Sequence, residues 1–563
     1  MREGSIVMIK MVDCLFIGHN EMDFAEYEKI VGKIGINSGA YRDLKLNFIP
    51  YNGRPYTVLE TFNLFCQNDQ GIPFKPVRML ETFSSAIAYL GTYLHRRGYT
   101  FDYVNSFQDE KEELVKKLMK ENILTIGIIT TLYISEFPII EIIDFIKQYN
   151  HTAKIIIGGP YISNKVRTME ARELACLFNN TLAADFYVNS SQGEATLVKI
   201  IQSLKNNLPV DHINNIYYRT DDGLTATPIL VEDNRLAENM VDWDLFETGV
   251  GKHVATRTSI SCPFSCAFCA SPEHAGKYQT VDVEVLEKEF NRLNKIESLM
   301  SVHIVDDTYN VPVDRFKKIL RMMIRNKYKF GWHSHFRCQF ADREMVRLMK
   351  ESNCMGVFLG IESGSDKILK NMNKVASVRR YKEGISYLKE HGIVSYGSFI
   401  IGFPGETDET VQETINFIKD TEIDFYRAQL WYCDPITPIW KEREKYKIRG
   451  GSFEWEHETM NSGSACDWID EIFLTMKKSV WIPYHHFDFD NLWHLIHQGM
   501  SIGQIKMFLR SFNDGVKENI VDRSLTEVGG EVIKDMKAAC LGESVLKDEI
   551  KKLDSFRAEF DFN

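Results

Sequence analysis

The chain has 563 residues, which is too long for one hydrophobic core and predicts about three domains. Its net charge of -11 argues against nucleic acid or an anionic membrane as the main partner, because both usually recruit a basic face. Eleven cysteines in a chain of this size do not make a secreted disulfide framework, and residues 5–13 lack the long apolar core of a signal peptide. The apolar stretch 123–146 is broken by charged residues and a proline. We therefore expect a cytoplasmic protein without a membrane span.

Short apolar runs alternate with amphipathic segments through residues 1–205, the first expected domain. The runs predict buried parallel strands and lie at residues 14–18, 101–104, 124–129, 154–157 and 185–188. The intervening segments, such as 84–97 and 139–148, have helical spacing. This alternation predicts a doubly wound, Rossmann-like α/β domain, in which ligands lie beyond the carboxyl ends of the strands.

The residues that follow three of these strands suit a bulky ligand. Adjacent glycines let a backbone approach such a ligand, and hydroxyl groups can hydrogen-bond to its amides. The candidate contacts are Thr130, Thr131, Gly158, Gly159, Pro160, Gly193 and Glu194.

An insertion at about residues 20–83 separates the first strand from the first helix. It places Arg42 and Arg54 beside aromatic residues, and an arginine fork suits phosphate, phosphinate or carboxylate groups. A packed surface elaboration with solvated arginines explains the segment equally well. Residues 206–245, rich in Asn, Asp and Pro, are expected to form a linker.

Strand-like runs with helical spacing between them recur through residues 246–445. They lie at residues 253–260, 301–305, 330–335, 356–360, 394–401 and 427–431. We expect a partial (β/α)6 barrel with its chemistry at the carboxyl ends of the strands. Residues 446–563 predict a small, mostly helical cap rich in aromatic side chains, which would exclude water from the barrel mouth or form ordinary core.

Three cysteines, Cys262, Cys266 and Cys269, have C-x3-C-x2-C spacing directly after the first of these runs. Three close thiolates can hold three irons of a cubane cluster, whereas structural zinc requires four ligands. Core thiols, half of a zinc site and a disulfide are the alternatives. No second C-x2-C follows to complete a zinc site, which favours a cluster with one open iron.

The cysteine motif, with Phe268 as its aromatic residue, resembles that of radical S-adenosylmethionine (SAM) enzymes. The resemblance implies a [4Fe-4S] cluster whose open iron binds SAM, and cleavage of SAM to a 5'-deoxyadenosyl radical. It also implies SAM contacts at the ends of later strands, although acids there often cap helices instead. These contacts are Asp306, Asp307, Glu362, Ser363, Ser398 and Gly402.

The first domain resembles the cobalamin-binding domain that precedes the radical SAM domain in one large subgroup. The motif D-x-H-x-x-G is missing, so we expect no histidine ligand below cobalt; His19 is the nearest candidate. A related fold that has lost its ligand is the alternative. Residues 38–43 and 158–163 are most similar to the phosphinate P-methyltransferase branch.

The combined resemblance implies a methyltransferase that uses SAM, the cluster and cobalamin in its methylcobalamin form. It would transfer methyl to a non-nucleophilic carbon or phosphinate phosphorus of a small molecule, in natural-product biosynthesis. A flavodoxin or ferredoxin is the expected electron donor. The alternatives are a non-methylating cyclisation or rearrangement, modification of a peptide, or a sensor without turnover.

Overall fold

The computed structural model describes residues 11–68, 76–78, 81–119, 122–221, 223–246, 249–522 and 524–540. Most of the N-terminal run and residues 541–563 of the expected cap lie outside the described residues. The chain divides into two compact units, each built from separate stretches of sequence. The first comprises Met1–Met22, Thr82–Phe330 and Pro435–Pro438, and the second Asp23–Glu81, Gly331–Asp434 and Ile439–Asn563.

The first unit contains a mostly parallel sheet in the order β10-β9-β8-β7-β6-β1-β5. Its parallel strands are β1 (Val12–His19), β5 (Phe101–Ser106), β6 (Ile123–Ile129), β7 (Lys154–Gly158) and β8 (Phe186–Val188). These strands confirm the predicted doubly wound sheet. The strand order reverses between β1 and β6, and ligands of such sheets bind at that switch point.

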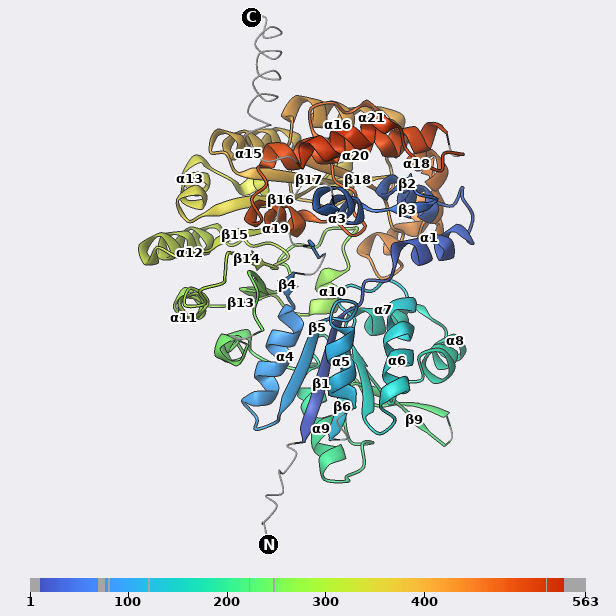
Figure 1. Ribbon diagram of the computed structural model, residues 1–563, viewed down its shortest axis with the longest axis vertical. Helices are drawn as coiled ribbons and strands as arrows, with labels where there is room; N and C mark the ends of the chain where they lie inside the picture. The colour runs from blue at the N-terminus through green and yellow to red at the C-terminus, as the bar shows by residue number, and fades with distance from the viewer. Residues whose placement is uncertain are drawn as a thin grey trace, which may run out of the picture. The chain divides into compact units, whose positions relative to one another are not determined.

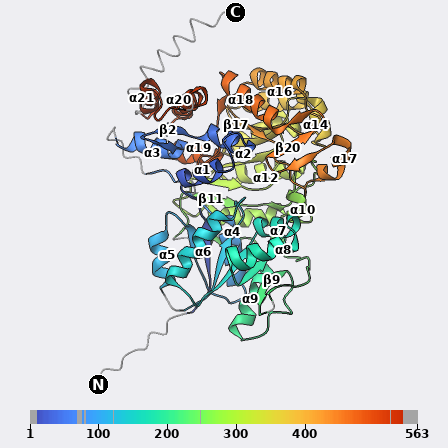
Figure 2. The same ribbon diagram turned by 90° about the vertical axis from the view of Figure 1, so that its right-hand side faces the viewer.

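Helices cover both faces of this sheet (Figures 1 and 2). Helix α5 packs beside α6, and α4 packs beside α9. Ser84 begins α4 by accepting a hydrogen bond from the backbone of Ile87, which satisfies one free N–H of the first turn. The helices are α4 (Ser85–His95), α5 (Lys111–Leu118), α6 (Phe137–Tyr149), α7 (Pro160–Thr168), α8 (Ala171–Cys176) and α9 (Glu194–Lys205).

The segment expected to be a linker contains two strands, β9 (Ile216–Thr220) and β10 (Gly223–Ala226). They extend the first sheet in antiparallel fashion from β8. These strands are only five and four residues long, so each has too few positions to stand out in a sequence. The prediction of a simple connector at 206–245 therefore needs this correction.

The first unit also contains the segments around the three cysteines. Strands β4 (Thr82–Phe83), β11 (His253–Thr256) and β14 (Ser301–Ile304) are parallel. A short hairpin, β12 (Ser259–Ile260) with β13 (Gln279–Thr280), brackets the cysteine loop. The following helices are α10 (Ser271–Ala275), α11 (Val283–Leu293) and α12 (Val313–Asn326).

The second unit contains a parallel sheet in the order β22-β18-β17-β16-β15. Its strands are β15 (Gly331–Phe336), β16 (Cys354–Glu362), β17 (Val394–Ile401), β18 (Phe425–Leu430) and β22 (Val480–Trp481). The helices between them are α13 (Arg343–Glu351), α14 (Asp366–Asn371), α15 (Val378–Glu390) and α16 (Asp408–Thr421). Together with β11 and β14, these strands confirm the expected barrel strands.

The insertion belongs to the second unit, together with the C-terminal region. Its elements are α1 (Phe24–Gly32), α2 (Gly39–Leu44), β2 (Ile49–Tyr51), β3 (Arg54–Tyr56) and α3 (Val58–Asn68). The C-terminal elements are α17 (Arg443–Tyr446), β19 (Arg449–Gly451), β20 (Glu454–His457), β21 (Met460–Asn461), α18 (Ser462–Thr475), α19 (Phe489–His497), α20 (Ile502–Val521) and α21 (Gly530–Ala539). We expected the insertion to elaborate the first domain, but the described part of it packs elsewhere.

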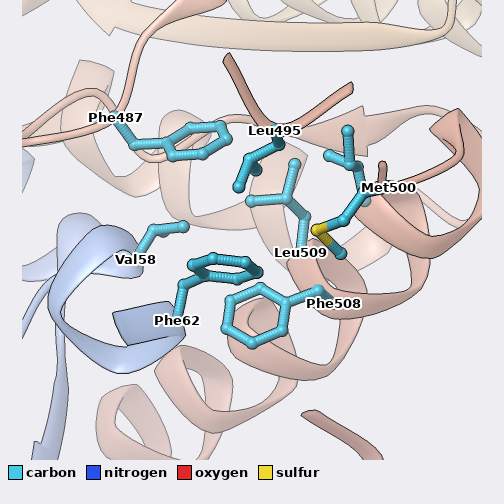
Figure 3. Close-up of a pocket in the computed structure, with 8 residues that line it drawn as sticks. Val58, Phe62, Phe487, Leu495, Met500, Phe508 and Leu509 are labelled. Carbon is cyan, nitrogen blue, oxygen red and sulfur yellow. The ribbon is translucent and has the colours of Figure 1, made fainter. Parts of the chain in front are cut away.

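Apolar and ionic contacts join the insertion to the C-terminal region. Val58 and Phe62 of α3 face Phe508 and Leu509 of α20 across a pocket too small for a water molecule (Figure 3). Buried Arg427 on β18 donates hydrogen bonds to Asp43 and Asn47 of the insertion. The pocket is therefore a packing junction, not a ligand site.

Candidate functional site

The three predicted cluster cysteines lie on one loop of the first unit. Cys266 is buried, and Cys262 and Cys269 are half-buried, as is Phe268. The N–H of Cys269 donates to the carbonyl of Cys266 at 3.1 Å, which closes a turn. Burial, with smaller contributions from Cys266, Asp307 and Cys262, raises the pKa of the Cys269 thiol to about 11. The donor set of three neighbouring sulfurs fits an iron–sulfur cluster, whose binding would displace the thiol protons.

Both arms of the cysteine loop are held by the residues that follow β14. Asp306 accepts from the N–H and hydroxyl of Thr258, each at 2.6 Å, before the first cysteine. Asp307 accepts from the hydroxyl of Ser271 at 2.6 Å, after the last cysteine. Burial raises the pKa of Asp306, and its hydrogen bonds with Thr258 oppose that shift.

The SAM contact expected at Asp306 stays a prediction, and in the structure this acid contacts the cysteine loop. Its carboxylate is 2% exposed and is turned toward Thr258 and Ser259, so it supports the cysteine loop. Asp307 is exposed and remains the more accessible of the two acids.

The carboxyl ends of β6, β7 and β8 are neighbours in the first sheet, as the sequence predicted. Thr130 is buried and donates its hydroxyl proton to the carbonyl of Gly158 at 2.8 Å, which joins the ends of β6 and β7. Gly159 has a φ of +115°, and a Cβ there would lie 2.8 Å from the Thr130 hydroxyl. Gly158 is half-buried, and a Cβ there would make only an ordinary contact with Val188, at 3.5 Å. Gly158 therefore leaves open space at this edge.

The loop after β6 presents apolar side chains that the sequence reading missed. Leu132 is 60% exposed and Ile134 is 76% exposed, and Thr131 is also exposed. Exposed branched residues at the switch point of a doubly wound sheet suit a large, partly apolar ligand. Pro160, the other predicted contact nearby, is half-buried at the start of α7.

His19 ends β1 next to this loop. Its ring stacks on Tyr133, with ring centres 5.0 Å apart. Burial lowers the pKa of His19 to about 4, so the imidazole is neutral at pH 7. His19 therefore packs against an aromatic ring at the end of a strand.

Gly193 and Glu194 begin α9 beside the same edge. Gly193 has a φ of +83°, which favours glycine. Glu194 is buried and lies 3.7 Å from Arg257, the residue that follows β11 toward the cysteine loop. Burial raises the pKa of Glu194, while Arg257 lowers it. The ion pair thus joins the sheet edge to the segment that enters the cysteine loop.

In the second unit, the two predicted SAM contacts at the end of β16 contact other side chains of the protein. Glu362 has a φ of +65° and forms a buried ion pair with Lys374 at 2.7 Å. Ser363 is fully buried, and its hydroxyl lies 3.3 Å from that of Thr414. Ser363 therefore shapes the turn, and Lys374, which no sequence motif indicated, neutralises Glu362.

The turn after β17 is fixed from both sides. Gly402 has a φ of +92°; its N–H donates to Glu406, and its carbonyl lies 3.0 Å from a ring nitrogen of His457. A Cβ on Gly402 would collide with Trp455. Ser398, farther back on β17, is 7% exposed and lies 3.5 Å from the amide of Gln429.

The insertion arginines are occupied by acidic partners. Arg42 forms ion pairs with Asp467 and Asp470, at 2.7 and 2.6 Å. Arg54 forms an ion pair with Glu60 at 3.1 Å. The prediction that they bind substrate therefore gives way to the packed-elaboration alternative.

Part of the chain is similar to a known protein family. Residues 257–418, which include the cysteine loop and the ends of β14, β16 and β17, match the radical SAM superfamily. The chain contains a radical SAM domain. No helix in the described part of the chain is long and apolar enough to cross a membrane.

Two relatives align with more than half of the chain. An uncharacterized methyltransferase of Pyrococcus horikoshii is 26% identical over 302 residues, which cover 52% of this chain and 64% of the relative. An anaerobic magnesium-protoporphyrin IX monomethyl ester cyclase of Rubrivivax gelatinosus is 22% identical, with 63% and 65% covered. The alignments thus span just under two thirds of both relatives.

A solved structure shares the fold over most of the chain. It is the cobalamin-dependent SAM radical enzyme OxsB with aqua-cobalamin and SAM bound, at a TM-score of 0.54 and 14% identity. The match covers 86% of this chain and 79% of that one. The doubly wound sheet and the radical SAM domain therefore form a known combination of folds.

Proposed function

We propose that this protein is a cobalamin-dependent radical SAM methyltransferase acting on a small molecule. The cysteine loop carries the proposal, because Asp306 and Asp307 hold both of its arms inside a radical SAM domain. The methyltransferase named among the relatives supports the reaction type. The open edge at Gly158 and the apolar loop at Leu132 support cobalamin as the second cofactor.

The chain's own residues would bind and orient the cofactors. Cys262, Cys266 and Cys269 would ligate the cluster, and Thr131, Leu132 and Ile134 would lie against the corrin. When bound, the cluster with SAM supplies a carbon-centred radical, and cobalamin supplies the methyl group. Glu362, neutralised by Lys374, is one candidate for the SAM side of the site, and Asp307 is another.

The substrate class is a centre that acids and bases cannot activate, either an unactivated carbon or a phosphinate phosphorus. Arg42 no longer supports a phosphinate, because Asp467 and Asp470 already bind it. We propose a cytoplasmic location, where the three cluster cysteines stay reduced, and a flavodoxin or ferredoxin as electron donor.

The test is anaerobic reconstitution with iron, sulfide and hydroxocobalamin, followed by reductant and SAM, with candidate carbon and phosphinate substrates. Both 5'-deoxyadenosine and S-adenosylhomocysteine should form, together with a methylated product. Cys262→Ala should lose the iron absorbance and 5'-deoxyadenosine. A full cluster in that variant would refute the ligand assignment.

A non-methylating reaction is the second candidate, because one relative is named as a cyclase. It would give 5'-deoxyadenosine without S-adenosylhomocysteine or methylated product. The same reconstitution therefore separates the two functions.

A further inference from the structure

Three consecutive residues after β14 contact the cysteine loop at three places. Asp306 holds the arm before Cys262, and Asp307 holds Ser271 after the last cysteine. The third residue, Thr308, reaches a cysteine itself: its hydroxyl oxygen lies 3.7 Å from the sulfur of Cys262. Thr308 is 4% exposed, so little water competes for this contact.

The hydroxyl of Thr308 also donates to the carbonyl of Asp307, at 2.7 Å. While Cys262 is a thiol, its S–H can donate to Thr308, and both contacts coexist. A cysteine that ligates iron is a thiolate and has no proton to donate. The hydroxyl proton must then turn from the Asp307 carbonyl to the sulfur if the contact is to remain a hydrogen bond.

We propose that Thr308 is a positioning residue that donates a hydrogen bond to the Cys262 sulfur and raises the reduction potential of the cluster. The inference rests on the proposed function, since it requires a cluster on Cys262. Reduction by an external one-electron donor adds negative charge to the cluster and its sulfurs, and a nearby donor stabilises that charge. The proton stays on the threonine oxygen throughout, so only an electron is transferred.

The sulfur of Cys269 illustrates the same kind of contact. It lies 3.4 Å from the backbone N–H of Ser271, which Asp307 helps to hold in place. A backbone donor is removed only by substitution with proline, which also restricts the backbone. The Thr308 hydroxyl can be removed by changing the side chain alone, which makes it the donor to test.

The experiment compares Thr308→Val, which removes the hydroxyl at similar volume, with Thr308→Ser, which keeps it. Thr280→Val makes the same chemical change at an exposed position of β13 and serves as the matched control. Each protein is reconstituted anaerobically, its iron is counted, and its midpoint potential is measured by dithionite titration with electron paramagnetic resonance. Thr308→Ala replaces the valine variant if that variant fails to fold.

We expect a full cluster with a more negative midpoint potential in Thr308→Val, and values close to the parent protein in Thr308→Ser and Thr280→Val. An unchanged potential in Thr308→Val would overturn the inference and leave the cluster assignment intact. Loss of iron from both Thr308→Val and Thr308→Ala would also overturn it, because Thr308 would then be needed for the cysteine loop to fold. Absence of a cluster from the parent protein would refute the proposed function itself.

Discussion

The carboxylate of Asp306 accepts two hydrogen bonds from Thr258, one from its backbone and one from its hydroxyl. Strand β14 and the segment entering the cysteine loop are thereby joined four residues before Cys262. Asp306 thus fixes the position of the segment that leads to Cys262. An acid at this strand end could support the cysteine loop or contact SAM, and these two roles can be tested separately.

Asp306→Ala should lower both the thermal stability and the iron content after reconstitution. The substitution leaves buried N–H groups of Thr258 and Ser259 without their acceptor, at a cost of about 1–3 kcal/mol each. Calorimetry and iron analysis would measure the two effects. Asp307→Ala, at an exposed neighbour, should change stability less. A stable Asp306→Ala protein with a full cluster but weakened SAM binding would instead restore the role expected from sequence.

The two glycines after β7 should respond differently to substitution. Gly158→Val should keep the fold but abolish cobalamin binding, because its side chain would extend into the open edge. Gly159→Ala should lower the melting temperature, because its φ of +115° disfavours a side chain and Thr130 is too close. Hydroxocobalamin titration by visible absorbance, alongside thermal unfolding, distinguishes them. Cobalamin bound by Gly158→Val with parent affinity would count against this edge as the site.

Glu406→Gln should stabilise the protein more at pH 8 than at pH 5. Burial raises the pKa of Glu406 from 4.5 to about 8, so the folded protein keeps a proton that the unfolded chain releases. The parent protein therefore loses stability as the pH rises from about 4.5 to about 8, and glutamine removes this dependence. Melting temperatures of both proteins across this range provide the measurement. A constant difference between them would show that the carboxyl titrates normally.

Removing Asp43 from its ion pair with Arg427 should lower the stability of the protein more than removing Arg427. Arg427 is 1% exposed, so Asp43→Ala leaves a buried charge without its partner, at about 3–5 kcal/mol. The Asp43 side chain is 21% exposed and can gain water after Arg427→Met. The urea midpoints of the two single variants and the double variant would show which substitution lowers stability more. A larger loss in Arg427→Met would indicate that packing against Trp481 outweighs the charge.

The sequence predicted those features that depend on local pattern. Strands such as β1 and β7 contain short continuous apolar runs, and the cysteine spacing is recognisable without any structure. The partners of the strand-end residues could not be predicted, because they come from distant segments. Lys374 neutralises Glu362 from twelve positions away, and no motif distinguishes it from the chain's other lysines.

The insertion shows a second limit of sequence reading. Its position between the first strand and helix of one sheet suggested a local elaboration. Its helix α3 instead buries apolar side chains against α20, more than 400 residues later, and periodicity does not specify the partner of an apolar face.

Residues 23–81 belong to a different compact unit from β1, the strand that precedes them, and this has a consequence for synthesis on the ribosome. Strand β1 is made before its partners β5 and β6, which lie about ninety or more residues downstream. Helix α3 is made long before its partner α20, which begins at Ile502. Apolar side chains such as Phe62 therefore lack their partners until Ile502–Val521 has been translated. We therefore expect fragments that end before α20 to aggregate, and recovery of the full-length protein to depend on chaperones.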